Sequence, residues 1–211
     1  MKILKAEFEI LTPINSEYIL TSLEKAGRTC YKSEKEITFD TAKKFVSKLI
    51  KKGHESVVEH QSISVKIVCD RGISHELVRH RLASYSQESQ RYCNYKDDII
   101  FILPCWIDIN CIGNEDFNLW YEMCEQSESN YKKLISIGWN PEEARCVLNN
   151  SVKTELVMTA NLREWRHFFK LRAEELYGRP HPQMLEITIP MLEKFKKLIP
   201  VIFDNIGVTN S

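Results

Sequence analysis

Alternation of apolar and polar residues predicts the strands of this chain. Apolar residues take every second position over 4–10, with lysine and glutamate between them, and again over 62–69. This period of two is typical of strands with one buried face. Two further stretches, 99–103 and 152–161, are rich in apolar and β-branched residues and predict two more strands.

Helical spacing of apolar residues marks the segments between and after these strands. The helices predicted in this way cover 39–50, 72–82, 116–138, 162–172 and 183–206. Gly53 follows the first of them, where a left-handed residue commonly ends a helix. Asn140 and Pro141, followed by two glutamates, predict the capped start of a further helix. Pro190 and Pro200 should kink or split the last one.

The order of these elements predicts the fold class. Strands and helices do not alternate strictly, and the chain has no internal repeat or linker. We therefore expect an α+β fold, a single domain over residues 1–211 with a mixed or antiparallel sheet flanked by helices. The length of 211 residues, with 43% hydrophobic and 27% charged residues, is ordinary for a globular protein.

Charge and cysteine content restrict the partners and the compartment. Lysine plus arginine and aspartate plus glutamate both number 29, so no global field attracts nucleic acid or a membrane surface. No run of ~18 apolar residues predicts a membrane span, and the first residues do not resemble a signal peptide. The seven cysteines form no C-x-x-C pair, which indicates reduced thiols and a cytoplasmic location. His54 and His60 lack the i, i+4 spacing of a helical metal pair, and we expect no metal.

Glycine and arginine positions indicate how a phosphorylated ligand could be held. The seven glycines never occur as G-x-G, which excludes the Rossmann fingerprint and the P-loop, so side chains must hold any nucleotide. Nine of the ten arginines lie within 71–91 and 145–179. Because guanidinium groups bind phosphate and carboxylate in a bidentate manner, these windows predict anion recognition. The alternative is surface ion pairing with acids such as Glu164, Glu174 and Glu175.

The segment 79–92, RHRLASYSQESQRY, combines arginine, serine and tyrosine as exposed binding segments do. It resembles the signature of the flavin-dependent thymidylate synthases, R-H-R-x-x-S-x-(N/S)-(E/Q)-x-S-x-R-Y. Other segments resemble that family in order and approximate spacing, over roughly three-fifths of the chain. They are Gly53-His54-Glu55-Ser56 with Glu59-His60, Ala144-Arg145, Asn161-Leu162-Arg163 with His167, Leu171-Arg172, and His181-Pro182-Gln183.

The resemblance implies an enzyme that converts dUMP to dTMP. It implies a homotetramer that binds FAD and uses NADPH and methylenetetrahydrofolate as co-substrates. The residues expected to contact FAD are Ser56, Arg79, His80, Arg81, Gln87, Asn161, Arg163 and His167. The residues expected to contact dUMP are Glu76, Arg79, Gln87, Ser89, Gln90, Arg91, Arg145 and Arg172.

Arg172 is the expected catalytic residue, in line with the family. Its guanidinium would stabilise the pyrimidine deprotonated at N3, since arginine itself cannot act as a base. No cysteine lies at a matched position, so a thiolate nucleophile is disfavoured. Attack by Ser89 remains an alternative, but its hydroxyl would need a base in contact, and the adjacent groups are an amide, a carboxylate and an arginine; we favour a phosphate-binding role.

Helix geometry predicts that the active site lies between subunits. At ~100° per residue, Arg163, Arg166, His167 and Lys170 share one face of the helix, whereas Arg172 lies about half a turn away. One flat pocket cannot easily use both faces, so Arg163 and Arg172 of one chain would serve different sites.

Two positions depart from the commonest family pattern. Ser86-Gln87 stands where Asn-Glu is usual, and Glu76 stands where an amide is frequent. A carboxylate beside a substrate phosphate needs neutralising, for which Arg79 and His80 are spaced suitably on a helix.

Two other functions remain open. A flavin-dependent relative could transfer a one-carbon unit to another pyrimidine nucleotide, or stop at the hydroxymethyl product. A non-enzymatic protein that binds single-stranded nucleic acid is suggested by arginines interleaved with aromatic residues. These residues are Tyr85, Tyr92, Trp165, Phe168 and Phe169. The helical spacing of the last three is explained more simply if they are core residues. Because the net charge is zero, we expect no nucleic-acid partner.

Overall fold

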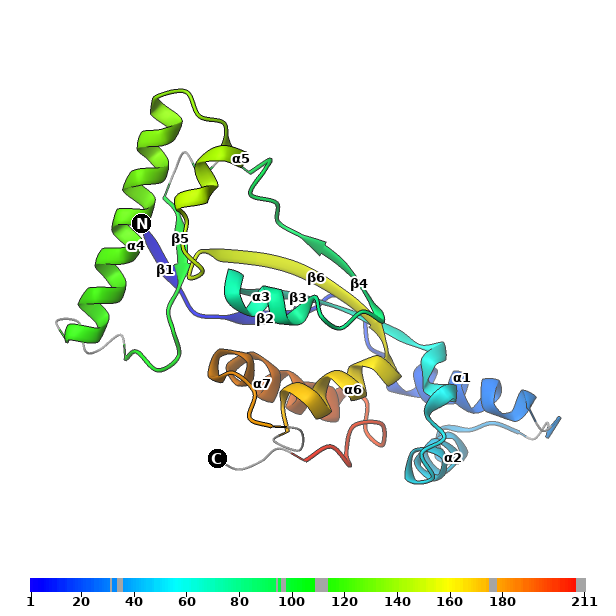
Figure 1. Cartoon of the computed structure of the whole chain (residues 1–211). Coiled ribbons are helices and arrows are strands. Elements are labelled where there is room, and N and C mark those ends of the chain that lie inside the picture. The colour runs from blue at the N-terminus through cyan, green and yellow to red at the C-terminus, as the bar shows by residue number, and fades with distance from the viewer. Residues whose placement is uncertain are drawn as a thin grey trace. The chain divides into compact units, whose positions relative to one another are not determined.

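The structure of the chain is a computed structural model, which describes residues 1–30, 32–33, 36–93, 95, 98–108, 114–174 and 178–207. Short strands, α-helices and 3-10 helices follow one another along the chain (Figure 1). In order they are β1 (Lys2–Leu4), β2 (Glu7–Ile10), α1 (Ser16–Thr29), α2 (Phe39–Lys51), η1 (Glu55–His60), β3 (Ser62–Asp70), α3 (Arg71–Leu77), β4 (Ala83–Gln87), β5 (Ile100–Ile102), α4 (Glu115–Ser136), α5 (Pro141–Ala144), η3 (Arg145–Val147), β6 (Lys153–Asn161), α6 (Leu162–Arg172) and α7 (Pro182–Leu198).

The chain divides into two compact units, each assembled from separate stretches of sequence. The first unit contains Met1–Phe8, Lys66–Arg79 and Tyr85–Val157, and the second contains Glu9–Val65, His80–Ser84 and Met158–Ser211. The expectation of a single domain over 1–211 stays a prediction. Among the described helices, none combines the length and the apolar character needed to cross a lipid bilayer.

The described strands form two sheets. The larger has the order β2-β3-β6-β4, and the smaller joins β1 to β5. β1 and β5 run parallel, with Ile3 opposite Phe101, whereas Phe101 and Val152 form an antiparallel bridge. The fold is therefore α+β, with mixed strand directions and helices beside the sheets, as the sequence predicts.

The core of the first unit lies between α4 and β5. Cys124 and Tyr131 on α4 and Phe101 on β5 are completely buried in one hydrophobic cluster. Glu128, on the same helix, accepts a hydrogen bond from the backbone N–H of Ile99 at 2.9 Å. Apolar packing and a buried carboxylate therefore fix α4 against the strand.

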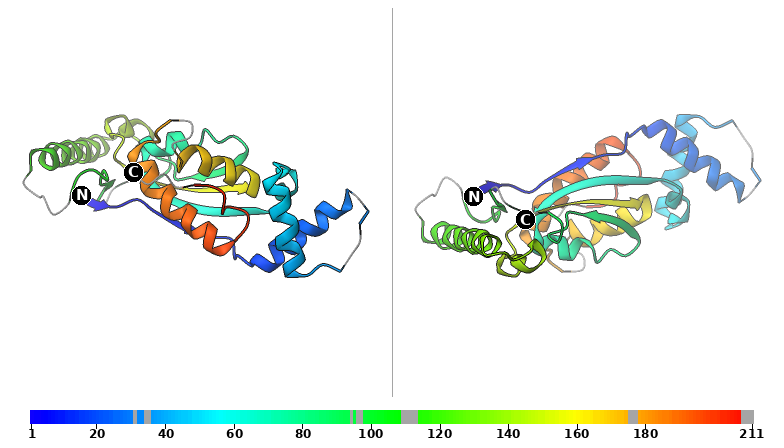
Figure 2. Two further views of the ribbon diagram at one scale, coloured as in Figure 1. Left: turned by 90° about the horizontal axis from the view of Figure 1, so that it is seen from below. Right: turned by 90° about the horizontal axis from the view of Figure 1, so that it is seen from above.

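The core of the second unit is an aromatic cluster around Trp165 on α6. The indole ring is fully buried, and its Nε1 donates to the carbonyl of Ile63 on β3 at 3.0 Å. Its centroid lies 5.4 Å from that of Phe168 and 5.2 Å from that of Phe195 on α7. Figure 2 shows α6 and α7 side by side. The cluster thus fixes α6 against both β3 and α7.

α1 and α2 pack together through one close glycine contact. A Cβ atom on Gly27 would lie 2.6 Å from the ring of Phe45, so only glycine allows this approach. The buried Glu24 accepts a hydrogen bond from the hydroxyl of Thr41 on α2 at 2.7 Å. The sequence patterns did not predict α1.

Several predicted elements are confirmed. α6 covers the predicted 162–172, and α2 ends as expected before Gly53, whose φ is +72°. Asn140 and Glu143 form the predicted capping box at the start of α5. α7 stops before Pro200, but it continues through Pro190, so the expected split there is wrong.

Other predicted boundaries are wrong. The strand expected over 4–10 is two strands, and Leu4 is 44% exposed. The helix expected over 72–82 ends at Leu77, where the carbonyl oxygen accepts a hydrogen bond from the hydroxyl of Tyr85 at 2.7 Å. Arg79 and His80 therefore lie beyond the helix, and their pairing with Glu76 stays a prediction.

The aromatic cluster generates a test of stability. We expect Trp165→Ala to lower the free energy of unfolding by about 3–5 kcal/mol, because it leaves a large cavity. Trp139 is 43% exposed, and Trp139→Ala should change it by less than about 1 kcal/mol. Equilibrium urea denaturation of both variants measures the difference, and equal losses would contradict this description of the core.

Candidate active site

The residues expected to bind ligands fall into two groups, one in each unit. Those expected to contact dUMP lie in the first unit, except Arg172. Those expected to contact FAD lie in the second unit, except Arg79 and Gln87.

A hollow of about 620 Å³ lies in the second unit, where α6 begins beside η1. Three of its lining residues, Asn161, Arg163 and His167, belong to the predicted FAD set. The others are Glu55, Glu59, Leu82, Glu164 and Lys170. Asn161 also caps α6, because its side-chain oxygen accepts from the backbone N–H of Glu164 at 2.9 Å. The cap fixes the position from which Arg163 and His167 project.

An exposed ion pair crosses this hollow. Arg163 contacts the carboxylate of Glu59 at 2.5 Å, with side chains 54% and 43% exposed. Such exposed pairs contribute ~0–1 kcal/mol, so an anionic ligand can displace Glu59 at little cost. η1, which carries Glu59, begins after His54 without a side-chain cap.

Arg166 is structural, although the helical repeat places it on the face of Arg163. Its side chain is completely buried and donates to Glu55 at 2.9 Å and to Asn205 Oδ1 at 2.9 Å. It also donates to the carbonyl oxygen of Ile202. Burial alone would raise the pKa of Glu55, but hydrogen bonding and the charge of Arg166 hold that pKa below its usual value. Arg166 therefore joins α6 to the C-terminal segment.

A buried histidine connects the predicted catalytic arginine to an acid. The Nε of Arg172 donates to Nε2 of His80 at 3.1 Å, and Nδ1 of His80 lies 3.4 Å from Oε1 of Glu164. The imidazole is 4% exposed and meets the ring of Phe168 edge-on, with centroids 4.9 Å apart. Burial, together with the charges of Arg172 and His167, lowers the pKa of His80 to about 4.

His80 is therefore neutral near pH 7 and accepts a hydrogen bond from Arg172. A ring that accepts at Nε2 carries its proton on Nδ1, which faces Glu164. Burial raises the pKa of Glu164. The three side chains form a chain of hydrogen-bonding groups that fixes the Arg172 guanidinium.

In the first unit, Gln87 at the end of β4 is held by two hydroxyls. Its Nε2 donates to Ser74 Oγ at 3.0 Å and to Thr154 Oγ1 at 3.2 Å. Arg71 donates to the same Thr154 oxygen and to the carbonyl of Glu88, both at 3.2 Å. The amide of Gln87 is therefore oriented by its protein partners.

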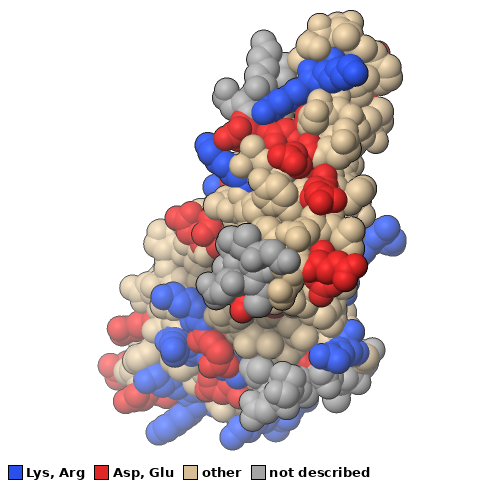
Figure 3. Space-filling model, turned by 90° about the vertical axis from the view of Figure 1, so that its left-hand side faces the viewer, with Lys and Arg blue, Asp and Glu red and all other residues tan. Residues whose placement is uncertain are grey.

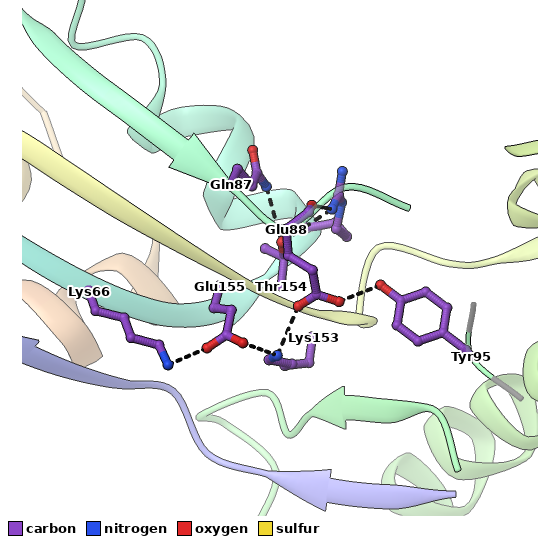
Figure 4. Close-up of polar contacts among 8 residues, drawn as sticks. Lys66, Gln87, Glu88, Tyr95, Lys153, Thr154 and Glu155 are labelled. Atoms are coloured by element: carbon purple, nitrogen blue, oxygen red, sulfur yellow. Dashed lines mark hydrogen bonds and ion pairs between the residues drawn. The ribbon is translucent and has the colours of Figure 1, made fainter. Parts of the chain in front are cut away.

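Glu88 anchors the following segment through alternating charges (Figure 4). Its carboxylate accepts from the hydroxyl of Tyr95 at 2.6 Å and from Nζ of Lys153 at 2.9 Å. Lys153 also contacts Glu155 at 3.1 Å, and Glu155 contacts Lys66 at 2.6 Å. Lys153 and Glu88 are only 15% and 14% exposed, so this pair is the best shielded of the three. Burial alone would lower the pKa of Lys153, but its two carboxylate partners raise it.

A turn after Glu88 carries the other predicted dUMP ligands. The hydroxyl of Ser89 accepts from the backbone N–H of Arg91 at 3.3 Å, and Gln90 is buried. The Nε of Arg91 contacts Glu142 on α5 at 3.0 Å, shortly before Arg145 begins η3. The segments that carry Arg91 and Arg145 are thus in contact.

The remaining predicted site residues differ in how far they are exposed. Ser56, Arg79, Arg81 and Arg145 are exposed, and Glu76 is partly buried. Among the described residues, no group of three His, Cys, Asp or Glu side chains is placed to hold a metal ion.

The sequence analysis missed residues that support the site. Lys153 and Glu155 project from one face of β6, two positions apart, and this alternation of opposite charges was visible in the sequence. The partner of Arg163 is Glu59, from a distant segment, and not one of the nearby acids considered as alternatives. Glu175 lies outside the described residues. Nothing in local spacing indicated the Glu59 contact.

His80 generates a prediction for the pH dependence of stability. The unfolded chain binds a proton at His80 near pH 6.5 and the folded chain near pH 4, so stability falls as pH decreases through this interval. The loss attributable to His80 is on the order of 3 kcal/mol. Urea denaturation between pH 4.5 and 8 should show a shallower decline for His80→Gln than for the unchanged chain. Other acids titrate in both proteins and cancel in this comparison, so identical slopes would contradict a neutral buried His80.

Comparison with known proteins connects this geometry to a family. A family model described as thymidylate synthase complementing protein, Thy1, matches residues 17–201. The flavin-dependent thymidylate synthase of Pyrococcus furiosus is 35% identical over 175 residues, which cover 81% of this chain and 69% of that protein. The one from Geobacter sulfurreducens is 34% identical over 190 residues, covering 86% and 79%.

A solved structure resembles the whole fold. It is the UMP/dUMP methylase PolB from Streptomyces cacaoi bound with 5-Br dUMP, with a TM-score of 0.78 and 20% identity. The match covers 97% of this chain and 96% of that chain. At 20% identity this structure shows only that the two folds are alike. Membership of a family is shown by the family model and by the relatives. The chain belongs to the flavin-dependent thymidylate synthase family.

Proposed function

We propose that this chain converts dUMP to dTMP, with methylenetetrahydrofolate as one-carbon donor and NADPH as reductant through FAD. The observation that carries the proposal is the contact between Arg172 and His80, in the same unit as the hollow lined by Arg163. The neutral imidazole accepts from Nε of Arg172 and so fixes the direction of the guanidinium. The guanidinium is therefore positioned to stabilise an anion.

The hollow in the second unit fits an anionic dinucleotide. Its volume of about 620 Å³ lies within the ~300–1,000 Å³ typical of cofactor sites. Arg163 and Lys170 supply positive charge, and Asn161 and His167 supply hydrogen-bonding groups. These residues would hold FAD, with Arg163 transferred from Glu59 to the pyrophosphate. The bound flavin would supply the redox and one-carbon chemistry.

The first unit offers groups suited to a pyrimidine nucleotide. Arg91 and Arg145 would bind the phosphate. The ion pair of Arg91 with Glu142 is exposed, so breaking it costs about as little free energy as breaking the pair of Arg163 with Glu59. Because Nε2 of Gln87 donates to the protein, its Oε1 is the atom oriented to accept from a ligand. Ser89 would contribute its hydroxyl, while Glu76 and Gln90 complete the proposed set.

Arg172 would act on the base by charge. Deprotonation at N3 makes the pyrimidine anionic and raises electron density at carbon 5, and a guanidinium fixed beside it stabilises that form without reorganising. Burial raises the pKa of Cys124 to about 11 and also raises that of Cys69, so neither thiol supplies a thiolate. Among the described residues, the hydroxyl of Ser89 meets the backbone N–H of Arg91, which is a donor and not a base.

Burial weighs against the nucleic-acid alternative. Trp165, Phe168 and Phe169 are completely buried and cannot stack on bases. The alternative of a different pyrimidine nucleotide is tested by running UMP beside dUMP in the assay. If UMP gave a methylated product and dUMP gave none, UMP would be the substrate instead of dUMP.

We also propose a homotetramer in the cytoplasm, with active sites built from more than one subunit. Arg163 projects into the hollow, whereas Arg172 turns to His80 near the other end of α6. The two arginines would then belong to different sites, as their angular separation on the helix suggests.

The first functional prediction concerns Arg172. Arg172→Ala should abolish formation of dTMP while the purified protein keeps its flavin, because the substitution removes the charge that stabilises the pyrimidine anion. Turnover is measured with dUMP, methylenetetrahydrofolate and NADPH, and bound flavin by absorbance. Unchanged turnover would contradict the proposed role.

Mixing inactive subunits provides a further measurement on Arg172. If each site takes Arg163 and Arg172 from different chains, refolded mixtures of Arg163→Ala and Arg172→Ala should regain up to about a quarter of the original activity. Each variant refolded alone is the control. No recovery in a mixture shown by sedimentation to be tetrameric would contradict a site shared in this way.

The second functional prediction concerns Glu88. Glu88→Gln weakens the anchor to Lys153, so the KM for dUMP should rise by about ten-fold, equivalent to ~1.4 kcal/mol. The KM for methylenetetrahydrofolate and the flavin content should stay within about two-fold. Lys66→Met, which removes the more exposed pair with Glu155, is the matched control and should leave all three close to their original values. Equal effects of both substitutions on dUMP would contradict the anchoring role.

A further inference from the structure

A second hollow of the second unit has a lining unlike that of the candidate active site. It measures about 620 Å³ and runs along α2. Its lining is predominantly lysine. The residues are Lys43, Lys44, Ser47, Lys48, Lys51, Lys52 and Val201. We call this surface the lysine groove.

The positive charge of the lysine groove is not balanced locally. Among the described residues, none of its five lysines forms an ion pair with a carboxylate, and the Nζ of Lys43 lies 3.8 Å from the ring centroid of Phe39. Asp40 is the single acid in the α2 sequence. On the face in Figure 3, by contrast, cations and anions are interspersed. In a chain with zero net charge, this groove is a local excess of positive charge.

The helix dipole explains only part of this arrangement. Lysines in the last turn are favoured by the negative end of the helix, which accounts for Lys48 and Lys51. Lys43 and Lys44 lie earlier, beyond the reach of that effect. Lys44, Lys48 and Lys52 follow one another at intervals of four and form a stripe along one face.

A chain of contacts connects the lysine groove to the hollow proposed to hold FAD. Val201 lines the groove, and the carbonyl of the next residue, Ile202, accepts a hydrogen bond from Arg166. Arg166 pairs with Glu55, which lines the FAD hollow. The pair of Arg166 and Glu55 therefore joins the segment after Val201 to the lining of the FAD hollow.

We propose that the lysine groove binds the γ-glutamyl tail of the folate co-substrate. This inference rests on the proposed function, in which the folate must reach the flavin of the hollow that this chain of contacts joins to the groove. Each added glutamate contributes one carboxylate, so a longer tail presents a flexible row of negative charges. Lysine ammonium groups on long, mobile stems suit such a chain, because they bind carboxylates as point charges without a fixed geometry.

The test compares folates with one glutamate and with five. For the unchanged enzyme, KM for methylenetetrahydrofolate pentaglutamate should be about ten-fold lower than for the monoglutamate at low salt, since several exposed pairs of ~0.2–1 kcal/mol add together. This ratio should fall as salt is added. In Lys44→Gln/Lys48→Gln/Lys52→Gln the ratio should approach one, while flavin content and KM for the monoglutamate change less than two-fold.

Matched controls separate the groove from general charge effects. Lys25→Gln/Lys194→Gln/Lys197→Gln removes the same charge from exposed positions on α1 and α7 of the same unit and should keep the ten-fold ratio. A ratio near one in the unchanged enzyme, or equal losses in both triple variants, overturns the inference. The inference is also overturned if the groove variant raises KM for NADPH instead, because the lysines would then bind a phosphate of NADPH. If the unchanged enzyme makes no dTMP with either folate, the proposed function itself fails, a result distinct from these.

Discussion

The hydrogen bond from Arg172 to His80 is the interaction on which the candidate site depends. A guanidinium can only donate, so the imidazole must be neutral to accept. Burial against Phe168 provides this condition by keeping the pKa of His80 at about 4. Phe168 also contacts Trp165, which hydrogen-bonds to β3. The aromatic core thereby sets both the position of α6 and the protonation state that fixes Arg172.

Burial also separates structural from functional arginines in this fold. Arg166 is completely buried, so removing its partner Glu55 would leave a buried guanidinium without its carboxylate. Arg163 and Arg91 instead pair with Glu59 and Glu142 in solvent, where the attraction is screened. In the proposed function, the exposed pairs would release these two cations to a phosphate at little cost. The same residue type would then serve architecture in one setting and recognition in the other.

The sequence predicted regular elements well because one hydrophobic face determines a helix or strand. α6 and the end of α2 at Gly53 are examples, whereas the end of α3 depends on Tyr85 binding the Leu77 carbonyl. Helical spacing also placed Arg163 and Arg166 on one face, but their roles differ because the carbonyl of Ile202 receives Arg166. That partner lies far along the chain, so no local pattern could reveal it. Family resemblance, rather than periodicity, supplied the candidate ligands.

The separation of arginine and lysine along the sequence would correspond, under these proposals, to two kinds of anion recognition. Arginine, a rigid planar donor, is proposed to hold a phosphate or an anionic ring at a defined distance. Lysine gathers in an open groove on α2, where several point charges can attract a chain of variable length. Both kinds of site are compatible with a net charge of zero. Acids balance the arginines locally, and acids elsewhere on the chain balance the lysines. Electrostatic specificity here would thus arise from local placement and donor geometry, with no contribution from an overall attractive field.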